Sequence, residues 1–333
     1  MTDNKLFTGH GGRIDVMARA FPHAPEPWLD LSTGINPWPY VVPTLAPEAW
    51  TRLPTEEARK ACEGAMANAF GCAPEACRAV GGTEIVIRQL PAILRSRSVA
   101  VRSPSYADHR HSWHAAGVEV RELDDPLEVV EDVDTVVLVN PNNPDGHCWS
   151  VGEMEEARRR LTRRGGWLIV DEAYAELDPE ASMAPAAGRA GLIVLRSFGK
   201  FFGLAGVRLG AFLAPPAVLD ELGEKVGGWD VSGPALAVGQ AAYADETWQK
   251  KTRGRLADAS LALQHVLSGA GLEDAGGTDL FRYVKTKDAA AVWRGLAENG
   301  VAVRRFENCN QALRIGLPPD PQSLSRLAKA LAV

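Results

Sequence analysis

The sequence SFGKFFGLAGVRLG, residues 197–210, surrounds a single lysine, Lys200, with glycine and apolar residues. It follows the apolar run Leu192–Leu195, which is typical of a buried strand. A lysine in such a turn is easily desolvated; desolvation lowers the pKa of its amine and makes it a nucleophile that forms Schiff bases with carbonyl compounds. Ser197 and Arg208 supply a hydroxyl and a guanidinium for a phosphate beside it. The alternative interpretation is a strand, a turn and a surface lysine.

Two further motifs precede this stretch. Residues 140–146 read NPNNPDG, and residues 170–174 read VDEAY. In this order and at this spacing, the three motifs resemble the fold-type I pyridoxal-phosphate enzymes, the class I and II aminotransferase family. The resemblance extends from about Asp30 to the C-terminus. It implies an α/β fold with a mostly parallel central sheet and a smaller α+β domain, and pyridoxal 5'-phosphate as the cofactor.

Composition limits the class of protein. The chain has 333 residues, which favours two domains. Its 36 basic and 42 acidic residues give a net charge of −6, which argues against a nucleic-acid partner. No apolar run is long enough to span a membrane, and the N-terminus lacks a signal-peptide core. The 5 cysteines are odd in number and lack metal-site spacing, which indicates thiols in a reducing compartment. We therefore expect a cytoplasmic protein without a membrane partner.

The order of elements predicts the domain boundaries. Strand and helix patterns alternate from residue 80 to residue 215, which predicts a mostly parallel sheet. We expect a large cofactor-binding domain over residues 46–245 and a small C-terminal domain over residues 246–333. Residues 1–45 are rich in Pro, Gly and His, and we expect them to form an arm that packs on the small domain.

A phosphate site is predicted where a helix begins. Gly82 and Thr83 open this helix and leave backbone N–H groups unpaired. Most such helix starts are simple caps. With Ser197 and Arg208 as partners, the four residues are expected to bind the cofactor phosphate, and the resemblance implies that Lys200 carries the cofactor.

The remaining cofactor residues come after strands. Asp171 ends the apolar run Trp167–Val170, where a carboxylate is costly unless it is paired. The resemblance implies that Asp171 holds the pyridine nitrogen protonated, which makes the ring an electron sink; the alternative is a helix cap. It also implies that Tyr174 and Asn143 hydrogen-bond the ring oxygen and that Tyr106 stacks on the ring. Lys200, Asp171 and Tyr174 are the expected catalytic residues.

Three histidines share one predicted helix: His109, His111 and His114. Their spacing of two and three residues does not place all of them on one helical face. We therefore expect no metal site.

Substrate-binding residues are predicted in the arm and near the C-terminus. His10, Gly11, Gly12 and Arg13 combine flexible backbone with two side chains that can bind an anion, although Ile14 to Arg19 can also start a helix there. Asn36 ends the segment LDLSTGINP (29–37), where Asn-Pro is often only a turn. Arg314 matches the family's carboxylate-binding arginine, a role that suits its planar fork. Because an arginine on an edge strand is usually solvated, Arg314 is assigned mainly by resemblance.

One position departs from the family. Many members carry a tyrosine before the proline at Pro54, and its hydroxyl reaches the cofactor phosphate of the partner subunit. This chain has Leu53 there, so that contact is not carried over. The family's active site lies at a homodimer interface, and we expect a homodimer.

Two enzyme groups within the family act on phosphorylated amino substrates of this size. They are the histidinol-phosphate aminotransferases and the threonine-phosphate decarboxylases of cobalamin synthesis. The arm with His10, the segment from Asp30 to Pro37 and the segment Trp229–Ser232 resemble the second group more closely. A non-enzymatic alternative is a transcription regulator with this fold as a sensor domain. Such a regulator needs a DNA-binding module, for which there is no room before Asp30.

Overall fold

The computed structural model describes residues 9–306 and 309–332. It divides into two compact units. Unit 1 comprises residues 1–39, 144–146 and 249–333, and unit 2 comprises residues 40–143 and 147–248. The N-terminal segment thus groups with the C-terminal part of the chain.

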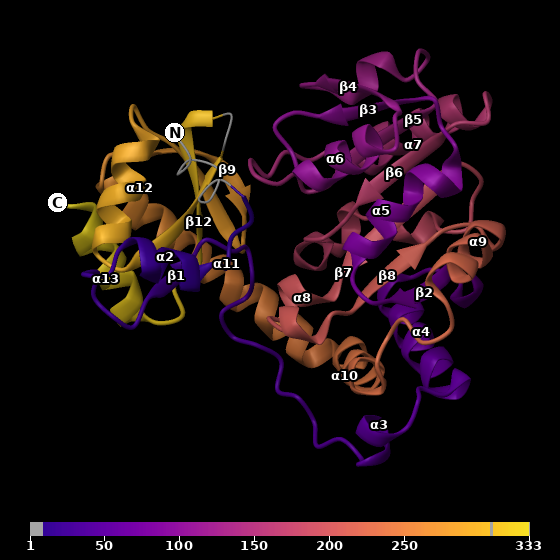
Figure 1. Cartoon of the computed structure of the whole chain (residues 1–333), viewed down its shortest axis with the longest axis horizontal. Coiled ribbons are helices and arrows are strands. Elements are labelled where there is room, and N and C mark those ends of the chain that lie inside the picture. The colour runs from indigo at the N-terminus through magenta and orange to yellow at the C-terminus, as the bar shows by residue number, and fades with distance from the viewer. Residues whose placement is uncertain (1–8, 307–308, 333) are drawn as a thin grey trace. The chain divides into compact units, whose positions relative to one another are not determined.

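Unit 2 is built on a seven-stranded sheet with the strand order β2-β8-β7-β6-β5-β3-β4 (Figure 1). β4, β3, β5, β6 and β7 pair in parallel, whereas β8 is antiparallel to both β7 and β2. This confirms the predicted mostly parallel sheet. Its strands are β2 (Cys77–Val80), β3 (Ser98–Arg102), β4 (Glu119–Leu123), β5 (Thr135–Val139), β6 (Trp167–Asp171), β7 (Leu192–Ser197) and β8 (Gly210–Leu213).

Helices cover this sheet. Side chains from α5, α6 and α9 share one buried cluster with β3, β5, β6, β7 and β8, while α7 packs against β6 and α10 against α4. The helices of unit 2 are α3 (Glu48–Thr51), α4 (Glu56–Phe70), α5 (Thr83–Leu94), α6 (Ala107–Ala115), α7 (Val151–Thr162), α8 (Phe198–Phe201), α9 (Pro216–Val226) and α10 (Gly233–Ala244), with short 3₁₀ turns η1 (Pro74–Ala76), η2 (Pro126–Val129), η3 (Ala175–Leu177), η4 (Pro179–Ala181), η5 (Ala184–Ala186) and η6 (Ala205–Val207).

Local sequence sets several of these helix ends. The Thr55 side chain accepts a hydrogen bond from the Ala58 N–H at the start of α4, and Gly71 ends α4 with a φ of +68°. At the start of α7, Ser150 and Glu153 form a capping box. The caps therefore fix where the chain enters and leaves the layers around the sheet.

Unit 1 contains a five-stranded sheet with the order β1-β11-β12-β10-β9, of which Figure 1 labels β1, β12 and β9. β1, from the N-terminal segment, pairs in parallel with β11, and the other pairs are antiparallel. Its elements are α2 (Ile14–Ala20), β1 (Leu29–Leu31), β9 (Glu273–Thr278), β10 (Phe281–Lys285), α12 (Ala289–Glu298), β11 (Val301–Phe306), β12 (Cys309–Gly316) and α13 (Pro321–Leu331). The long helix α11 (Glu246–Gly269) precedes β9.

No helix within residues 9–306 and 309–332 is both long enough and apolar enough to cross a membrane.

Candidate active site

Strand register brings the predicted cofactor residues to one edge of the unit 2 sheet. In the parallel ladder, Val139 pairs with Asp171 and Asp171 pairs with Leu195, so β5, β6 and β7 end together. Asn143, Tyr174 and Lys200 come just after these strand ends. The carboxyl edge of a parallel sheet is where α/β proteins bind ligands.

The antiparallel strand β8 returns the chain to the same edge. Gly210, its first residue, pairs with Ser197 on β7 and with Val80 on β2. Arg208 therefore lies just before β8 at the edge where β7 ends. Gly82 lies there too, since β2 runs antiparallel to β8 and ends at Val80. Residues from distant parts of the chain thus meet at one sheet edge.

Gly82 and Arg208 form a tight contact. Gly82 has a φ of +91°, and a Cβ at this position would lie 2.7 Å from Arg208 Nη2. A Cβ on Gly210 would lie 3.2 Å from the Thr83 nitrogen. The Arg208 guanidinium therefore lies over the N-terminus of the 12-residue helix α5. A guanidinium beside unpaired helix N–H groups is suited to a phosphate group.

Lys200 lies half-buried in the short helix α8. Phe198, Phe201 and Phe202 around it are fully buried, and the rings of Phe198 and Phe202 stack at 4.6 Å. Within the described part of the chain, no hydrogen bond or ion pair involves the Lys200 amine. The aromatic packing therefore fixes the turn while the amine is available for a covalent partner.

Asp171 is 3% exposed and accepts two hydrogen-bond contacts. Its Oδ2 lies 2.9 Å from His109 Nε2, and its Oδ1 accepts from the Ala173 N–H at 3.2 Å. His109 is itself 2% exposed, and its Nδ1 has no partner among the described residues. The Asp171 carboxylate therefore has a buried imidazole beside it.

Sequence reasoning missed the role of His109, because it considered this residue only as a metal ligand. A signal was present: His109 and Trp113 are four residues apart and form the buried face of α6. His111 and His114 lie off that face, and neither is buried.

Tyr106 precedes α6, and its ring meets the His109 ring edge-on with centroids 6.1 Å apart. Burial raises the pKa of the Tyr106 phenol, and Asp108 adds to the effect, so the phenol stays protonated at neutral pH. Ser105 donates to Asn142 Oδ1 at 2.6 Å, which connects this turn to the loop that carries Asn143. Asn143 is half-buried.

Tyr174 is 2% exposed and stands at the start of η3, three residues after Asp171. The predicted cofactor residues thus lie at or just after the ends of β2, β3, β5, β6 and β7, together with one that precedes β8. All nine lie in unit 2: Gly82, Thr83, Tyr106, Asn143, Asp171, Tyr174, Ser197, Lys200 and Arg208.

The predicted substrate residues all lie in unit 1. Gly12 donates its N–H to Ser32 Oγ at 2.8 Å, and a Cβ on Gly11 would lie 2.3 Å from the Ser32 carbonyl oxygen. The glycines are therefore required where the arm passes β1. This contact fixes the segment between His10 and Arg13.

Arg314 lies on β12, the central strand of the unit 1 sheet, and it is 6% exposed, so it does not occupy the solvated edge-strand position that was its alternative interpretation. Its Nη2 donates to the Ser32 carbonyl oxygen at 3.0 Å. Asn36 is 2% exposed, and its Oδ1 accepts from the Trp38 N–H at 2.9 Å.

Arg304 is a further basic residue that sequence reasoning missed. It is the direct cross-strand partner of Arg314 in the β11–β12 pair. Like charges at such positions destabilise a sheet unless an anion compensates them. The available signal was the cluster of two arginines, Arg304 and Arg305, at the end of an apolar strand.

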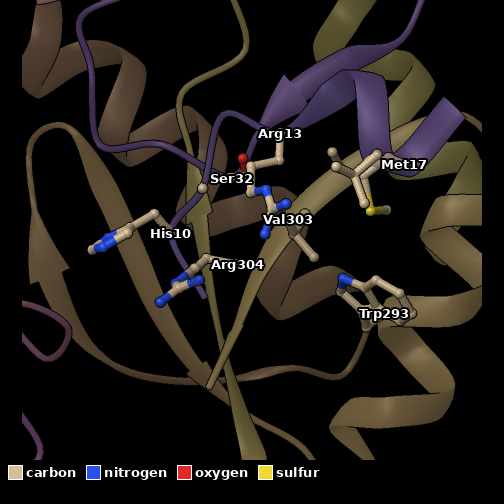
Figure 2. Close-up of a pocket in the computed structure, with 10 residues that line it drawn as sticks. His10, Arg13, Met17, Ser32, Trp293, Val303 and Arg304 are labelled. Carbon is tan, nitrogen blue, oxygen red and sulfur yellow. The ribbon is translucent and has the colours of Figure 1, made fainter. Parts of the chain in front are cut away.

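A pocket in unit 1 is lined by the basic side chains of His10, Arg13 and Arg304 (Figure 2). Figure 2 shows Arg13 and Arg304 between His10 on one side and Trp293 with Met17 on the other. The pocket is lined by His10, Gly11, Arg13, Val16, Met17, Ser32, Trp293, Ala302, Val303 and Arg304. Its chemistry suits a small anion with an apolar part.

The groups at the edge of the unit 2 sheet fit pyridoxal 5'-phosphate. Lys200 can bond to its carbonyl, the start of α5 with Arg208 can bind its phosphate, and the buried Asp171 carboxylate can accept from its ring nitrogen. Residues 29–331 match the family described as aminotransferase class I and II, and the chain belongs to this family. It is a pyridoxal-phosphate-dependent enzyme of fold type I.

Among curated proteins, a threonine-phosphate decarboxylase of Pseudomonas aeruginosa is 43% identical and spans 97% of this chain and 96% of its own length. One from Sinorhizobium sp is 39% identical and spans 97% of each chain. A histidinol-phosphate aminotransferase of Citrifermentans bemidjiense is 26% identical over 92% of this chain and 91% of its own. The crystal structure of the Sinorhizobium meliloti histidinol-phosphate aminotransferase with pyridoxal-5'-phosphate has the same fold, with a TM-score of 0.78 at 20% identity, covering 100% of this chain and 96% of that one.

Proposed function

We propose that this enzyme decarboxylates L-threonine O-3-phosphate to (R)-1-amino-2-propanol O-2-phosphate, a reaction of cobalamin biosynthesis. The observation that carries the proposal is its identity to two threonine-phosphate decarboxylases along nearly the whole chain. The alternative, a histidinol-phosphate aminotransferase, is supported by more distant relatives.

Each cofactor residue is assigned one role. Lys200 bonds to the cofactor carbonyl, and Asp171, supported by His109, keeps the pyridine nitrogen protonated. When bound, the cofactor supplies a ring that accepts the electron pair left by the breaking bond. Gly82, Thr83, Ser197 and Arg208 bind the cofactor phosphate, Tyr174 and Asn143 hydrogen-bond its ring oxygen, and Tyr106 stacks on its ring.

The substrate has two anionic ends, and unit 1 offers two groups of donors. We assign the phosphate to His10, Arg13 and the backbone of Gly11 and Gly12, with Arg304 added by the pocket. Arg314 and Asn36 then orient the carboxylate. Decarboxylation breaks the bond from Cα to this carboxylate, whereas transamination breaks Cα–H. Binding energy from the phosphate would thus be used for orientation at the reacting bond.

The direct test is to incubate the purified, cofactor-loaded protein with L-threonine O-3-phosphate and to measure released carbon dioxide. A parallel reaction contains histidinol phosphate and 2-oxoglutarate. Carbon dioxide from the first reaction supports the proposal. Glutamate from the second, with no carbon dioxide from the first, would establish the aminotransferase instead.

Changing His10 and Arg13 together to alanine is expected to lower kcat/KM for threonine phosphate by on the order of 100-fold or more. Each change removes a charge-assisted hydrogen bond worth about 1.5–3 kcal/mol. The affinity for the cofactor should not change, since none of its assigned ligands lies in this segment.

Arg19→Ala is the matched control for this pair. Arg19 lies on α2, and its partner is the exposed Asp15 at 2.8 Å. This variant should retain normal kcat/KM. A His10/Arg13 double variant with the activity of the Arg19 control would mean that the arm does not bind the phosphate.

We also propose that the enzyme is a homodimer. Unit 2 exposes four large apolar side chains within a short segment: Val41 at 80%, Val42 at 45%, Trp50 at 69% and Leu53 at 64%. Such a concentration is unusual on a monomer and is typical of an interface. A second copy of the chain is the occupant that we assign to this segment, because the family's active site lies at a subunit interface.

Changing Trp50 to glutamate is expected to convert the dimer to a monomer, because it replaces one of these exposed apolar side chains with a charge. Sedimentation velocity at micromolar concentration measures the change in mass. Leu261→Glu, at a side chain that is 56% exposed on α11, should leave the mass unchanged. An unchanged mass for Trp50→Glu would remove this segment from the interface.

The five cysteines are free thiols, which agrees with a reducing compartment and supports a cytoplasmic location.

A further inference from the structure

A buried ion cluster lies behind the cofactor residues of unit 2. Its centre is Arg196, whose Nη1 donates to Glu172 Oε2 at 2.9 Å and whose Nε donates to Glu176 Oε1 at 3.2 Å. Arg196 and Glu176 are 3% exposed, and Glu172 is fully buried. Because buried ion pairs seldom add net stability, stability alone is a weak explanation for this cluster.

Each acidic member of the cluster is held by more than one donor. Glu172 also accepts from the Ser182 hydroxyl and, at 2.6 Å, from the Met183 N–H. Glu176 Oε1 also forms an ion pair with Arg196 Nη2 at 2.9 Å, so two guanidinium nitrogens lie close to this oxygen. The Arg196 guanidinium lies 4.5 Å from the centre of the Phe70 ring. Burial alone would lower the pKa of Arg196, but the carboxylates of Glu176 and Glu172 raise it, so the guanidinium stays charged.

The members of the cluster adjoin the cofactor residues in sequence. Glu172 comes directly after Asp171, and Arg196 precedes Ser197. Side chains alternate between the faces of a strand, and Asp171 pairs with Leu195 in the ladder. One face therefore presents Asp171 and Ser197, and the opposite face presents Arg196 with its partners.

The backbone ladder between β6 and β7 ends at this point. Its last hydrogen bond runs from the Glu172 N–H to the Leu195 carbonyl oxygen at 2.8 Å. Beyond it, Arg196 and Ser197 pair with β8, and the chain after β6 turns into η3. Beyond that point, the contacts of Arg196 with Glu172 and Glu176 connect the segment of Asp171 and Tyr174 to the segment of Ser197 and Lys200.

We infer that Arg196 is a positioning residue that sets the alignment of Asp171 and Tyr174 with Ser197 and Lys200. Its planar fork bonds two carboxylates that lie on one segment while its own backbone lies on the other. Lysine would keep the charge but could not hold both carboxylates in a fixed geometry. The inference rests on the proposed cofactor site but not on the identity of the phosphorylated substrate.

The test compares Arg196→Lys with Arg282→Lys. Arg282 forms an ion pair with Asp274 in unit 1, so its substitution makes the same chemical change away from the cofactor site. Three readouts are measured well below the melting temperature: the cofactor dissociation constant, the circular dichroism of the bound cofactor and the separate values of kcat and KM.

We expect Arg196→Lys to change the cofactor's circular dichroism, to weaken its binding and to lower kcat by on the order of 10- to 100-fold, the cost of a misplacement near 1 Å. KM should change little, because the substrate residues are in unit 1. Arg282→Lys should lower only the melting temperature. If Arg196→Lys fails to fold, Glu176→Gln keeps the Glu172 bond and should produce a smaller change of the same kind.

The inference is overturned if Arg196→Lys, or Glu176→Gln in its place, lowers the melting temperature but leaves the cofactor's dichroism and kcat as in the unsubstituted protein. The cluster would then be structural only. The dichroism is measured without substrate, so a protein that fails to decarboxylate threonine phosphate still gives a clear result for Arg196.

Discussion

Replacing Lys200 with alanine is expected to abolish turnover. The lysine is assigned the covalent bond to the cofactor, and an amine at that position can also transfer a proton at the reacting carbon. Loss of a proton-transfer group alone costs roughly 10²–10⁴-fold in rate, and the loss of covalent attachment adds to this. The measurements are the rate of carbon dioxide release and the mass of the protein after borohydride treatment, which makes the cofactor bond permanent.

Lys225→Ala is the control, because Lys225 lies in the last turn of α9 and outside the cofactor set. It should retain both the activity and the borohydride-stable mass gain. A Lys200→Ala protein that still gains the cofactor mass would show that another lysine carries the cofactor.

The second large effect is expected for Asp171→Asn. Asparagine keeps the size of the side chain but cannot hold the ring nitrogen protonated by charge. Removal of one preorganised interaction of this kind costs about 2.7–4 kcal/mol, or on the order of 10²–10³ in kcat. The buried His109 imidazole would also lose its carboxylate partner. The measurement is kcat at saturating cofactor.

Asp134→Asn is the matched control at the opposite edge of the same sheet. The Asp134 carboxylate accepts from the Arg97 N–H just before β5 begins, far along the strand from Asn143. We expect near-normal kcat for this variant. An Asp171→Asn enzyme with comparable activity would rule out the pairing with the ring nitrogen.

The sequence predicted the fold of unit 2 because its central strands, β5, β6 and β7, contain continuous apolar runs of the kind that a doubly covered parallel sheet buries. Thr135–Val139 is buried at every position, as its composition predicts. The end of each such strand also locates the residue that comes next in the chain. For this reason, Asp171 could be placed at a strand end from the sequence alone.

The histidine beside Asp171 could not be predicted in the same way. His109 and Asp171 are 62 residues apart, and their contact depends on the packing of α6 against the sheet. The spacing of the three histidines indicated only that they do not form a metal site. It gave no information about Asp171 as the partner of His109. The burial of His109 and Trp113 depends on how α6 packs in the folded protein.

The neighbouring arginines of unit 1 could not be predicted from the sequence for a different reason. Arg304 and Arg314 become neighbours only through the antiparallel register of β11 and β12. For Arg314, the sequence left a solvated edge-strand position open as an alternative, because nothing local distinguishes a central strand from an edge strand. That distinction arises when β12 pairs with β10 on one side and with β11 on the other.

The β7–β8 pairing has a consequence for how the cofactor would be held. Ser197 and Gly210 are direct partners, so Lys200 and Arg208 belong to one closed hairpin. Their separation depends on the short length of chain between these partners and on no other strand. Asp171, Asn143 and Tyr106 reach the same edge by crossovers of helix and loop. A shift of one strand relative to another would therefore move the groups that we assign to the cofactor ring. Lys200 and Arg208, which we assign to its carbonyl and its phosphate, would instead move together.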